Sequence, residues 1–445
     1  MQKKALLALL LGLTLILSGC TLIQKDPEVD AATEIVRMGD SVVTKGEFQK
    51  EVDDELNYMA YMYSMYGYPY DATSAENVKA ARESVLATVK QRLVSQAKIR
   101  EMGLDQLTSE EEAQVETNAQ STFDSYVSQM KSTNYASSEL SEEEIKAACV
   151  KDLEGMGITM DTVREAERES FVTEKLRSEV IKDIAVSDEE VKTEYDKRVE
   201  TGKTNYESDA SSWCSARNNG STLYYTPAGV RYVKQILIKY DDQPAITDAN
   251  TRISDANGRI SAAQAILDKA DATDEEKTQA QADLEAARKD LETAQADLQT
   301  ATDAAYATID AEADEVLARL ASGEEFETVM AEKTDDPGMQ TGAATAERGY
   351  AVCTGMASFD SAFVDAAMGL AKPGDVTGKV RGASGGYYII KYVSDATEGP
   401  VELDSVKDTI HSSLLSSKQS EHFNTTMTQW VDATEFKVDL GALDN

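Results

Sequence analysis

The residue types that most often carry chemistry are scarce in this chain of 445 residues. Only two histidines occur, His411 and His422, and both lie near the C-terminal end. Cys149, Cys214 and Cys353 are far apart and form no CxxC or Cys/His spacing. This pattern excludes most histidine-based metal sites and a Ser-His-Asp triad in the middle of the chain. We therefore expect no metal and no cofactor.

A fourth cysteine, Cys20, stands in a context that predicts modification. Two lysines precede an uncharged, mostly apolar run from Ala5 to Leu17, which has the length of a signal-peptide core and is too short to span a bilayer. Leu-Ser-Gly directly before Cys20 resembles the bacterial lipobox. We expect residues 1–19 to be removed, lipid to attach to Cys20 and residues 20–34 to form a tether. The alternative is a plain secretory signal cleaved nearby, with Cys20 incidental.

The composition limits the classes of partner. The formal net charge is −36, which argues against nucleic acid, because phosphates need Lys and Arg. It favours solubility and is also compatible with basic client proteins. No second apolar segment is long enough to cross a membrane. The length after cleavage predicts two or three domains in a body outside the cytoplasmic membrane.

The N-terminal half is predicted to be mostly helical. Residues 35–44 have the pattern of a strand pair, and Thr44 with Glu47 forms a capping-box pattern for the helix that follows. Helical periodicity extends to Tyr195, with loop signals near 66–73 and 132–139 and a capped start at Ser187. Residues 200–228 are rich in Gly, Ser, Asn and Pro and predict a loop.

One stretch of this half is unusual in composition. Residues 57–70 read NYMAYMYSMYGYPY. Adaptable Met and amphipathic Tyr suit a surface that holds varied unfolded segments. The same residues also suit the core packing of a helix that runs into a loop, and both interpretations stay open.

The C-terminal half is predicted to be mixed α/β. Residues 230–240 and 385–393 are rich in β-branched and aromatic residues and predict strands. Between them, Ala and Ile or Leu recur every seven residues on two segments within 247–322, separated by a helix start at Thr273. This predicts an antiparallel helical hairpin projecting from the domain; one long solvated helix is the alternative. Residues 404–430 predict a C-terminal helix that needs a partner surface.

Several motifs of this half resemble the parvulin family of peptidyl-prolyl isomerases. They are, in chain order, VKQILI from Val233, LARLASGEEF from Leu317, TDD from Thr334, FDSAFVDAAMGL from Phe359, PGDV from Pro373 and GYYIIK from Gly386. The flanks are similar to foldase lipoproteins of the PrsA type and their SurA-like relatives. The similar segments are GDSVVTKGEF from Gly39 and the stretch from Gly157 (GIT) through the segment near Ser187.

The resemblance implies an α+β fold with four parts after the signal peptide and tether. They are a helical chaperone domain at 35–228, a parvulin-like domain at 229–396, the coiled-coil hairpin inserted in it at 246–306, and a C-terminal helix at 397–445 that packs on the N-terminal domain.

The resemblance also implies a site for proline. Phe359 and Phe363, four apart on an expected helix, share one face and line the proline pocket together with Met356. Ordinary core packing of both rings is an equally weighted alternative. Asp336 matches the acidic or cysteine position at the rim of the family's site.

The two histidines usual in the family are absent. Gln235 and Tyr388 occupy their positions, and neither side chain titrates near neutral pH. Glu347 to Tyr350 also departs from the family's glycine-rich turn. Catalysis by Asp336, Gln235 and Tyr388 is therefore an open question.

The function implied is that of an extracytoplasmic foldase, lipid-anchored to the cell membrane, that binds exported unfolded proteins. Its implied activity is cis–trans isomerisation of X-Pro bonds. The alternative is a client-holding or scaffold lipoprotein with a degenerate parvulin domain and no catalysis. No nucleic-acid partner is expected.

Overall fold

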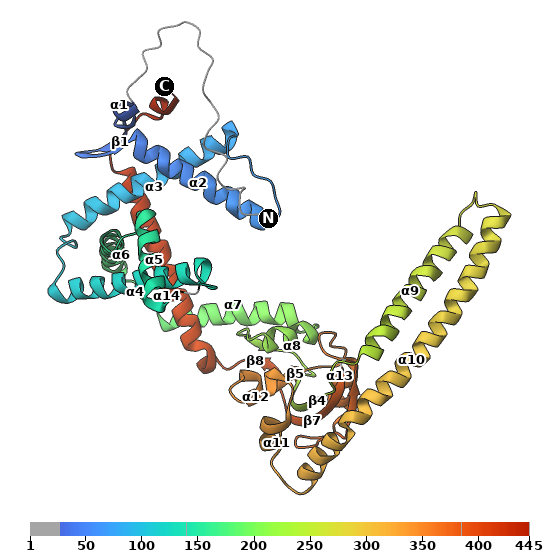
Figure 1. Cartoon of the computed structure of the whole chain (residues 1–445). Helices are drawn as coiled ribbons and strands as arrows, with labels where there is room; N and C mark the ends of the chain where they lie inside the picture. The colour runs from blue at the N-terminus through green and yellow to red at the C-terminus, as the bar shows by residue number, and fades with distance from the viewer. Residues whose placement is uncertain (1–26, 139, 384, 445) are drawn as a thin grey trace. The chain divides into compact units, whose positions relative to one another are not determined.

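The computed structural model describes residues 27–138, 140–383 and 385–444, and its fold is α+β as predicted (Figure 1). Cys20 and the segment before it lie outside the described residues. Two compact units divide the chain: the first contains residues up to Ala185 and those from Leu415 onward, and the second contains Val186–Leu414. Within the part of the chain that is described, no helix combines the length and apolarity needed to cross a bilayer.

The first unit is mainly helical. Its helices are α1 (Pro27–Ala31), α2 (Lys45–Met65), α3 (Ala75–Glu101), α4 (Ser109–Asn134), α5 (Glu142–Gly155), α6 (Met160–Ile181) and the second half of α14 (Leu403–Asp432). Its short strands are β1 (Glu34–Met38), β2 (Ser41–Thr44) and β9 (Lys437–Val438), in the order β2-β1-β9, and the 3₁₀ helix η2 (Leu440–Asp444) follows.

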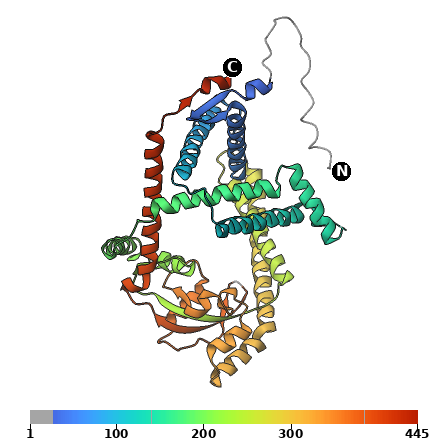
Figure 2. The ribbon, with the colours of Figure 1, turned by 90° about the vertical axis from the view of Figure 1, so that its left-hand side faces the viewer.

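Local sequence signals explain the start of this unit. The predicted strand pair turns at Gly39, whose φ of 58° suits glycine. Thr44 and Glu47 form the expected capping box at the start of α2. From there α2 and α3 run side by side, as Figure 2 shows, and pack through a shared core that includes Phe48, Val52 and Val89.

The second unit alternates helices with short strands. Its helices are α7 (Asp188–Tyr206), α8 (Ala210–Asn218), α9 (Pro244–Leu267), α10 (Asp274–Ala321), α11 (Phe326–Lys333), the 3₁₀ helix η1 (Pro337–Met339), α12 (Ala344–Arg348), α13 (Ser361–Gly369) and the first half of α14. Its strands are β3 (Tyr225–Thr226), β4 (Arg231–Lys239), β5 (Tyr350–Val352), β6 (Val380–Gly382), β7 (Gly386–Asp395) and β8 (Gly399–Pro400).

A four-stranded antiparallel sheet organises this unit. Its order is β5-β4-β7-β6, so the two predicted strands, β4 and β7, lie at its centre. Alternation along the strands sends Ile236 and Ile389 to one face, where α10 and α11 cover them. Val233 and Ile390 lie on the other face, which α13 and α8 cover. Both faces of the sheet are therefore buried.

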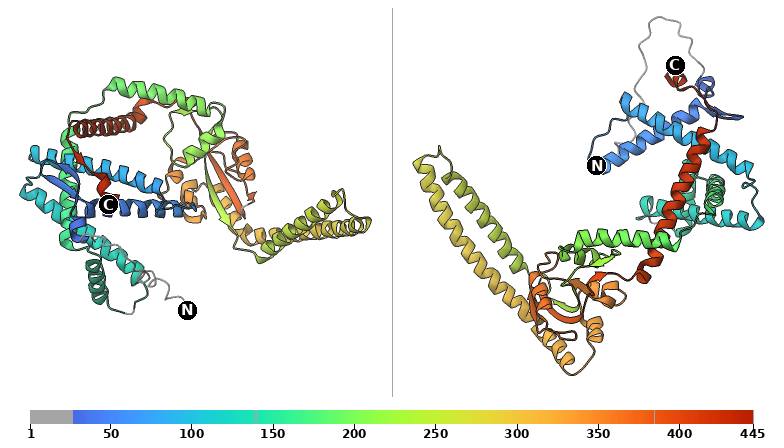
Figure 3. Two further views of the ribbon diagram at one scale, coloured as in Figure 1. Left: turned by 90° about the horizontal axis from the view of Figure 1, so that it is seen from above. Right: turned by 180° about the vertical axis from the view of Figure 1, so that it is seen from behind.

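The helical hairpin is formed by α9 and α10, which lie side by side in Figures 1 and 3. The alanines at heptad positions, such as Ala256 and Ala287, are buried between the arms. Arg252 pairs with Asp297 at 2.8 Å and Arg259 with Asp290 at 2.7 Å. From the first ion pair to the second, the residue number rises by seven on α9 and falls by seven on α10, which demonstrates the antiparallel register.

Two details differ from the sequence predictions. The loop predicted at 200–228 contains the end of α7 and all of α8, because Asp209 caps α8 and Trp213 and Cys214 are buried against the sheet. These residues pack in the second unit, not in the N-terminal one. Tyr306, which we assigned to the hairpin, is buried against the sheet, and its hydroxyl donates to the carbonyl oxygens of Gly382 and Gly386.

Candidate functional site

The free edge of the central strand β4 positions the candidate site. Strand β5 pairs only with the first residues of β4, from Arg231 to Val233. Beyond them the segment from Thr334 takes over, since the Asp335 N–H donates to the Leu237 carbonyl at 2.8 Å. The Lys239 N–H in turn donates to the Asp335 carboxylate at 2.8 Å. This docking places the next residue, Asp336, beside Gln235.

Asp336 and Gln235 are both buried, and the structure brings them into direct contact. The Gln235 amide Nε2 donates to Asp336 Oδ2 at 2.7 Å. The Gly338 N–H donates to Oδ1 at 2.9 Å, and the Tyr350 hydroxyl lies 3.1 Å from Oδ2. The carboxylate charge is thus held by three donors. Gln235 Oε1 is buried and has no hydrogen-bond partner among the described residues.

Tyr350 is the residue of this cluster that the sequence reasoning missed. It begins β5 after Gly349, whose φ is 88° and whose Cβ, if present, would lie 2.8 Å from the Val233 carbonyl oxygen. A Cβ on Gly338 would collide with the Tyr350 hydroxyl. Both glycines therefore allow the tyrosine to reach Asp336. The Glu-Arg-Gly-Tyr departure from the family turn was the only available signal, and it did not indicate this contact.

Burial, with the neighbouring Asp336 carboxylate next in importance, raises the pKa of Tyr350. The phenol consequently stays protonated at neutral pH and acts as a donor. Burial likewise raises the pKa of Cys214 and of Cys353, so neither thiol is an activated nucleophile.

A row of four aromatic rings runs from this cluster into the core; we call it the aromatic row. Tyr350 and Phe359 have ring centroids 5.1 Å apart, Phe359 and Phe363 5.4 Å, and Phe363 and Tyr388 5.3 Å. Phe363 is 2% exposed and Met356 3%, whereas Phe359 is only partly buried. Phe359 is therefore the member of the expected pocket that a ligand can reach with least rearrangement.

The expectation that Phe359 and Phe363 share a helix is wrong. Helix α13 begins at Ser361, and Asp360 is its N-cap, with Oδ1 accepting the Ala362 N–H at 2.9 Å. Phe359 lies before the cap, and the two rings meet through the turn of the chain. Tyr388 reaches the same cap, since its hydroxyl lies 3.4 Å from Asp360 Oδ2. Gln235 and Tyr388 thus belong to two separate polar groups.

The site combines polar side chains with an aromatic surface. No cluster of three or more His, Cys, Asp or Glu side chains that could hold a metal ion occurs within the described ranges. The cluster instead offers a carboxylate, an unpaired amide oxygen and an aromatic surface.

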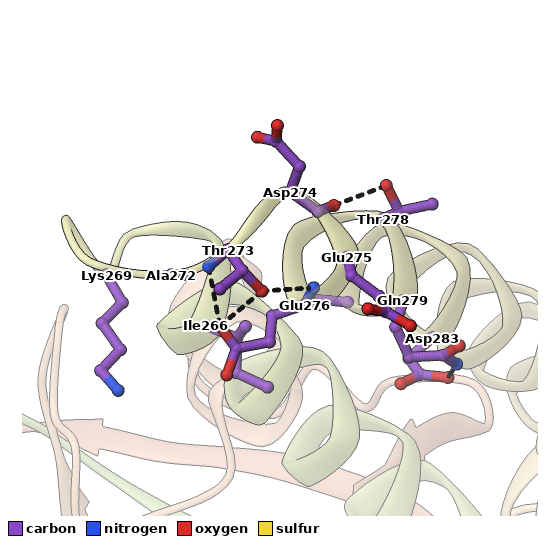
Figure 4. A pocket seen from close by; sticks show the side chains of 11 residues that line it. Ile266, Lys269, Ala272, Thr273, Asp274, Glu275, Glu276, Thr278, Gln279 and Asp283 are labelled. Carbon is purple, nitrogen blue, oxygen red and sulfur yellow. Dashed lines mark hydrogen bonds between the residues drawn. The ribbon is translucent and has the colours of Figure 1, made fainter.

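A separate hollow at the tip of the hairpin is not part of this site. Figure 4 shows its lining around the capping box of α10, where Thr273 Oγ1 accepts the Glu276 N–H at 3.2 Å. Thr278 donates to the Asp274 carbonyl and Gln279 donates to Asp283. The capping box satisfies an N–H of the first turn, and the other two bonds join residues four apart on α10, so a structural role explains the group.

Comparisons with known proteins found one family model and several curated relatives. The family model described as "Rotamase: PPIC-type PPIASE domain" matches residues 291–394. The foldase protein PrsA of Clostridium botulinum (strain Hall) is 21% identical over 440 residues, covering 98% of this chain and 97% of that protein. The PrsA of Clostridium acetobutylicum is 24% identical over 198 residues, covering 44% of this chain and 54% of that protein.

Two solved structures are also similar. The PrsA structure from Streptococcus pneumoniae has 12% identity and a TM-score of 0.26, with 93% of this chain and 97% of that chain covered. The PrsA structure from Bacillus cereus has 14% identity and a TM-score of 0.20, with 93% and 96% covered.

The family match covers the part of the second unit that holds Asp336, the aromatic row and β7. It defines a peptidyl-prolyl isomerase domain of the parvulin type. The chain as a whole is similar over nearly its full length to curated PrsA foldases, and its second unit carries the parvulin-type match. The match begins at residue 291, within α10, and so does not include β4.

Proposed function

We propose that this chain is an extracytoplasmic foldase that holds exported, incompletely folded proteins and receives their X-Pro segments at the Asp336 site. The observation that carries the proposal is the contact between Asp336, Tyr350 and the aromatic row, all within residues 291–394 of the family match, with Gln235 of β4 bonded to Asp336. A proline ring needs an apolar face, and a peptide needs polar partners for its backbone.

Isomerisation breaks no covalent bond, and its barrier of ~18–20 kcal/mol comes from lost amide resonance. A catalyst must therefore favour the twisted amide over the planar one. Phe359, which is only partly buried, offers an apolar surface for the proline ring, and the hydrogen bonds of Asp336 with Gln235 and Tyr350 fix the polar side chains beside it. By the resemblance to parvulins, Gln235 and Tyr388 stand at the two positions where the family usually has histidines. We therefore expect slow or undetectable isomerisation with effective client holding.

Two assays on the whole chain separate holding from catalysis. A protease-coupled assay on proline tetrapeptides measures isomerisation, and light scattering of a denatured client measures suppression of aggregation. Asp336→Ala should lower any isomerisation more than binding, because the carboxylate is polar and the ring surface remains. Isomerisation as fast as that of parvulins with both histidines would show that Gln235 and Tyr388 support catalysis fully.

The competing scaffold function predicts a different result. A scaffold with a degenerate domain would neither bind proline peptides nor suppress aggregation. The similarity to curated foldases over 98% of the chain favours holding of clients.

We further propose lipid on Cys20 as the membrane anchor. The Leu-Ser-Gly-Cys sequence after a short apolar run supports this proposal. The alanine heptads of α9 and α10 support a coiled-coil hairpin as an element separate from the isomerase core.

A further inference from the structure

The end of helix α2 exposes an aromatic surface that the core does not use. Phe48, Val52 and Leu56 bury the first part of the helix, but none of the nine residues from Asn57 to Met65 is buried. The helix thus extends more than two turns beyond its core. We call the exposed side chains of this end and of the following turn the tyrosine surface; they are Tyr58, Tyr61, Tyr63, Met65, Tyr66 and Tyr68.

The side chains of the tyrosine surface are largely exposed, and several of them share one face of α2. Tyr61, Met65 and Tyr66 are 61%, 64% and 72% exposed. Tyr58, Tyr61 and Met65 are three and seven residues apart and share one helix face. This finding contradicts core packing for most of the tyrosine-rich stretch, one of the two interpretations left open by the sequence.

Local contacts hold the surface in place. The rings of Tyr63 and Tyr70 lie 5.0 Å apart, and the Tyr68 N–H donates to the Tyr63 carbonyl at 3.0 Å. Gly67, with φ of 74°, makes the turn. Tyr70 then returns to the core of the first unit. The rings are therefore presented on a fixed backbone, which limits the entropy lost when a ligand binds.

The charges around the tyrosine surface select the partner. No charged residue occurs from Leu56 to Tyr70, and no Lys or Arg occurs between Lys50 and Lys79. All charges within those limits are acidic, but Glu51 pairs with Arg92 and Asp54 with Lys50. The acidic border therefore consists of Asp53, Glu55, Asp71 and Glu76. An uncharged aromatic surface with an acidic border attracts a partner that combines apolar and basic groups. It repels an anionic lipid surface.

We propose that the tyrosine surface binds extended segments of non-native polypeptide that carry aromatic or aliphatic side chains flanked by Lys or Arg. Tyr rings supply apolar area, their hydroxyls pair with the exposed backbone of an unfolded segment, and Met adapts to different side chains. The proposal rests on the foldase function and names the class of client segment that the first unit takes. It assigns client binding to a surface separate from the Asp336 site.

The test compares two variants of the full chain. Tyr61→Ser/Tyr66→Ser/Tyr68→Ser removes three rings of the tyrosine surface. Tyr126→Ser is the matched control, because Tyr126 is a 43% exposed tyrosine on α4 outside this surface. Circular dichroism and thermal unfolding establish that both variants fold.

The probe is a labelled 15-residue peptide of Phe, Leu, Lys and Arg, and fluorescence anisotropy measures its dissociation constant. We expect the triple variant to bind at least about tenfold more weakly and the control to bind within about twofold of the parent. A peptide with Glu in place of Lys and Arg should bind the parent more weakly, and added salt should reduce that difference.

Three outcomes would overturn the inference. If the triple variant binds the peptide as tightly as the parent and the chain still suppresses client aggregation, the tyrosine surface is not the binding site but the foldase function is retained. If the parent chain neither binds the peptide nor suppresses aggregation, both the binding site and the foldase function are contradicted. If the triple substitution instead abolishes binding of the unlipidated Cys20→Ala chain to phosphatidylcholine vesicles and leaves peptide binding unchanged, the surface contacts membranes.

Discussion

Truncation of Phe363 should mainly lower stability, whereas truncation of Phe359 should mainly weaken peptide binding. Phe363 is 2% exposed and lies between the rings of Phe359 and Tyr388, so its role in the folded chain is packing. Phe363→Ala should lower the free energy of unfolding of the second unit by about 3–5 kcal/mol, the usual cost of a buried Phe→Ala change. At ~2–4 °C per kcal/mol, this lowers its melting temperature by roughly 6–20 °C.

Phe359 is only partly buried, so Phe359→Ala should cost less, about 1–2 kcal/mol. Its effect should appear in binding: a proline peptide that covers this ring loses about 1–3 kcal/mol of affinity. Phe359→Ala is thus the variant that reports on the pocket, and Phe363→Ala is the matched control for packing.

The assay can observe the second unit by itself. The chain has two tryptophans, and Trp213 is buried in the same core as Phe363, where its Nε1–H donates to the Tyr225 carbonyl at 2.6 Å. In a Trp430→Phe background, urea unfolding followed by Trp213 fluorescence gives the free energy, and anisotropy gives peptide binding. The reasoning is refuted if Phe363→Ala costs less than about 1 kcal/mol and weakens peptide binding more than Phe359→Ala does.

Four further predictions follow from individual contacts. Burial raises the pKa of Tyr350, so the protonated phenol stabilises the fold fully below the pKa of about 10 in the unfolded chain, and this stability is lost as the pH rises above that value. Tyr350→Phe should therefore reduce the alkaline loss of unfolding free energy measured by urea titration. An unchanged dependence of that free energy on pH would contradict the assignment. Gly338→Ala should cost about 1–3 kcal/mol by displacing that ring, and combining it with Tyr350→Leu should recover part of the loss in the same titrations. Replacing residues 252–297 by a short Gly/Ser linker should leave cooperative unfolding of the second unit, whereas replacing 246–306 should abolish it; equal behaviour of the two variants would argue against a core role for the end of the longer segment. Cys20→Ala should release the chain from the membrane fraction or stall its processing, and unchanged retention and processing would rule out lipidation there.

Short-range sequence patterns were sufficient to predict many of the helices and strands. The strand pair at β1 and β2, the capping box of α2, the helix starts of α7 and α10, and the central strands β4 and β7 all occur where the sequence predicted them. Each depends on residues within a few positions of one another, so the spacing in the sequence already contains the interaction. The family resemblance, carried by short motifs in order, is confirmed by the match to residues 291–394.

The ends of helices and strands were less predictable where tertiary packing determines them. The Gly, Ser and Asn content of residues 200–228 indicated a loop, yet α8 forms there because Trp213 and Cys214 gain burial against the sheet. Tyr306 continues the heptad helix without a break, so nothing local indicates that it leaves the hairpin and enters the core.

The contacts of the candidate site depend on the tertiary structure. The sequence, through the family resemblance, selected Asp336, Gln235 and Phe359 as members. It did not select Tyr350, and it placed Phe359 on a helix that begins two residues later. Gln235 and Asp336 are 101 positions apart, with the whole hairpin between them. Only the docking of the segment from Thr334 on the free edge of β4, and the space left by Gly338, bring the carboxylate, the amide and the phenol together, because hydrogen bonds depend on the path of the folded chain and not on spacing along it.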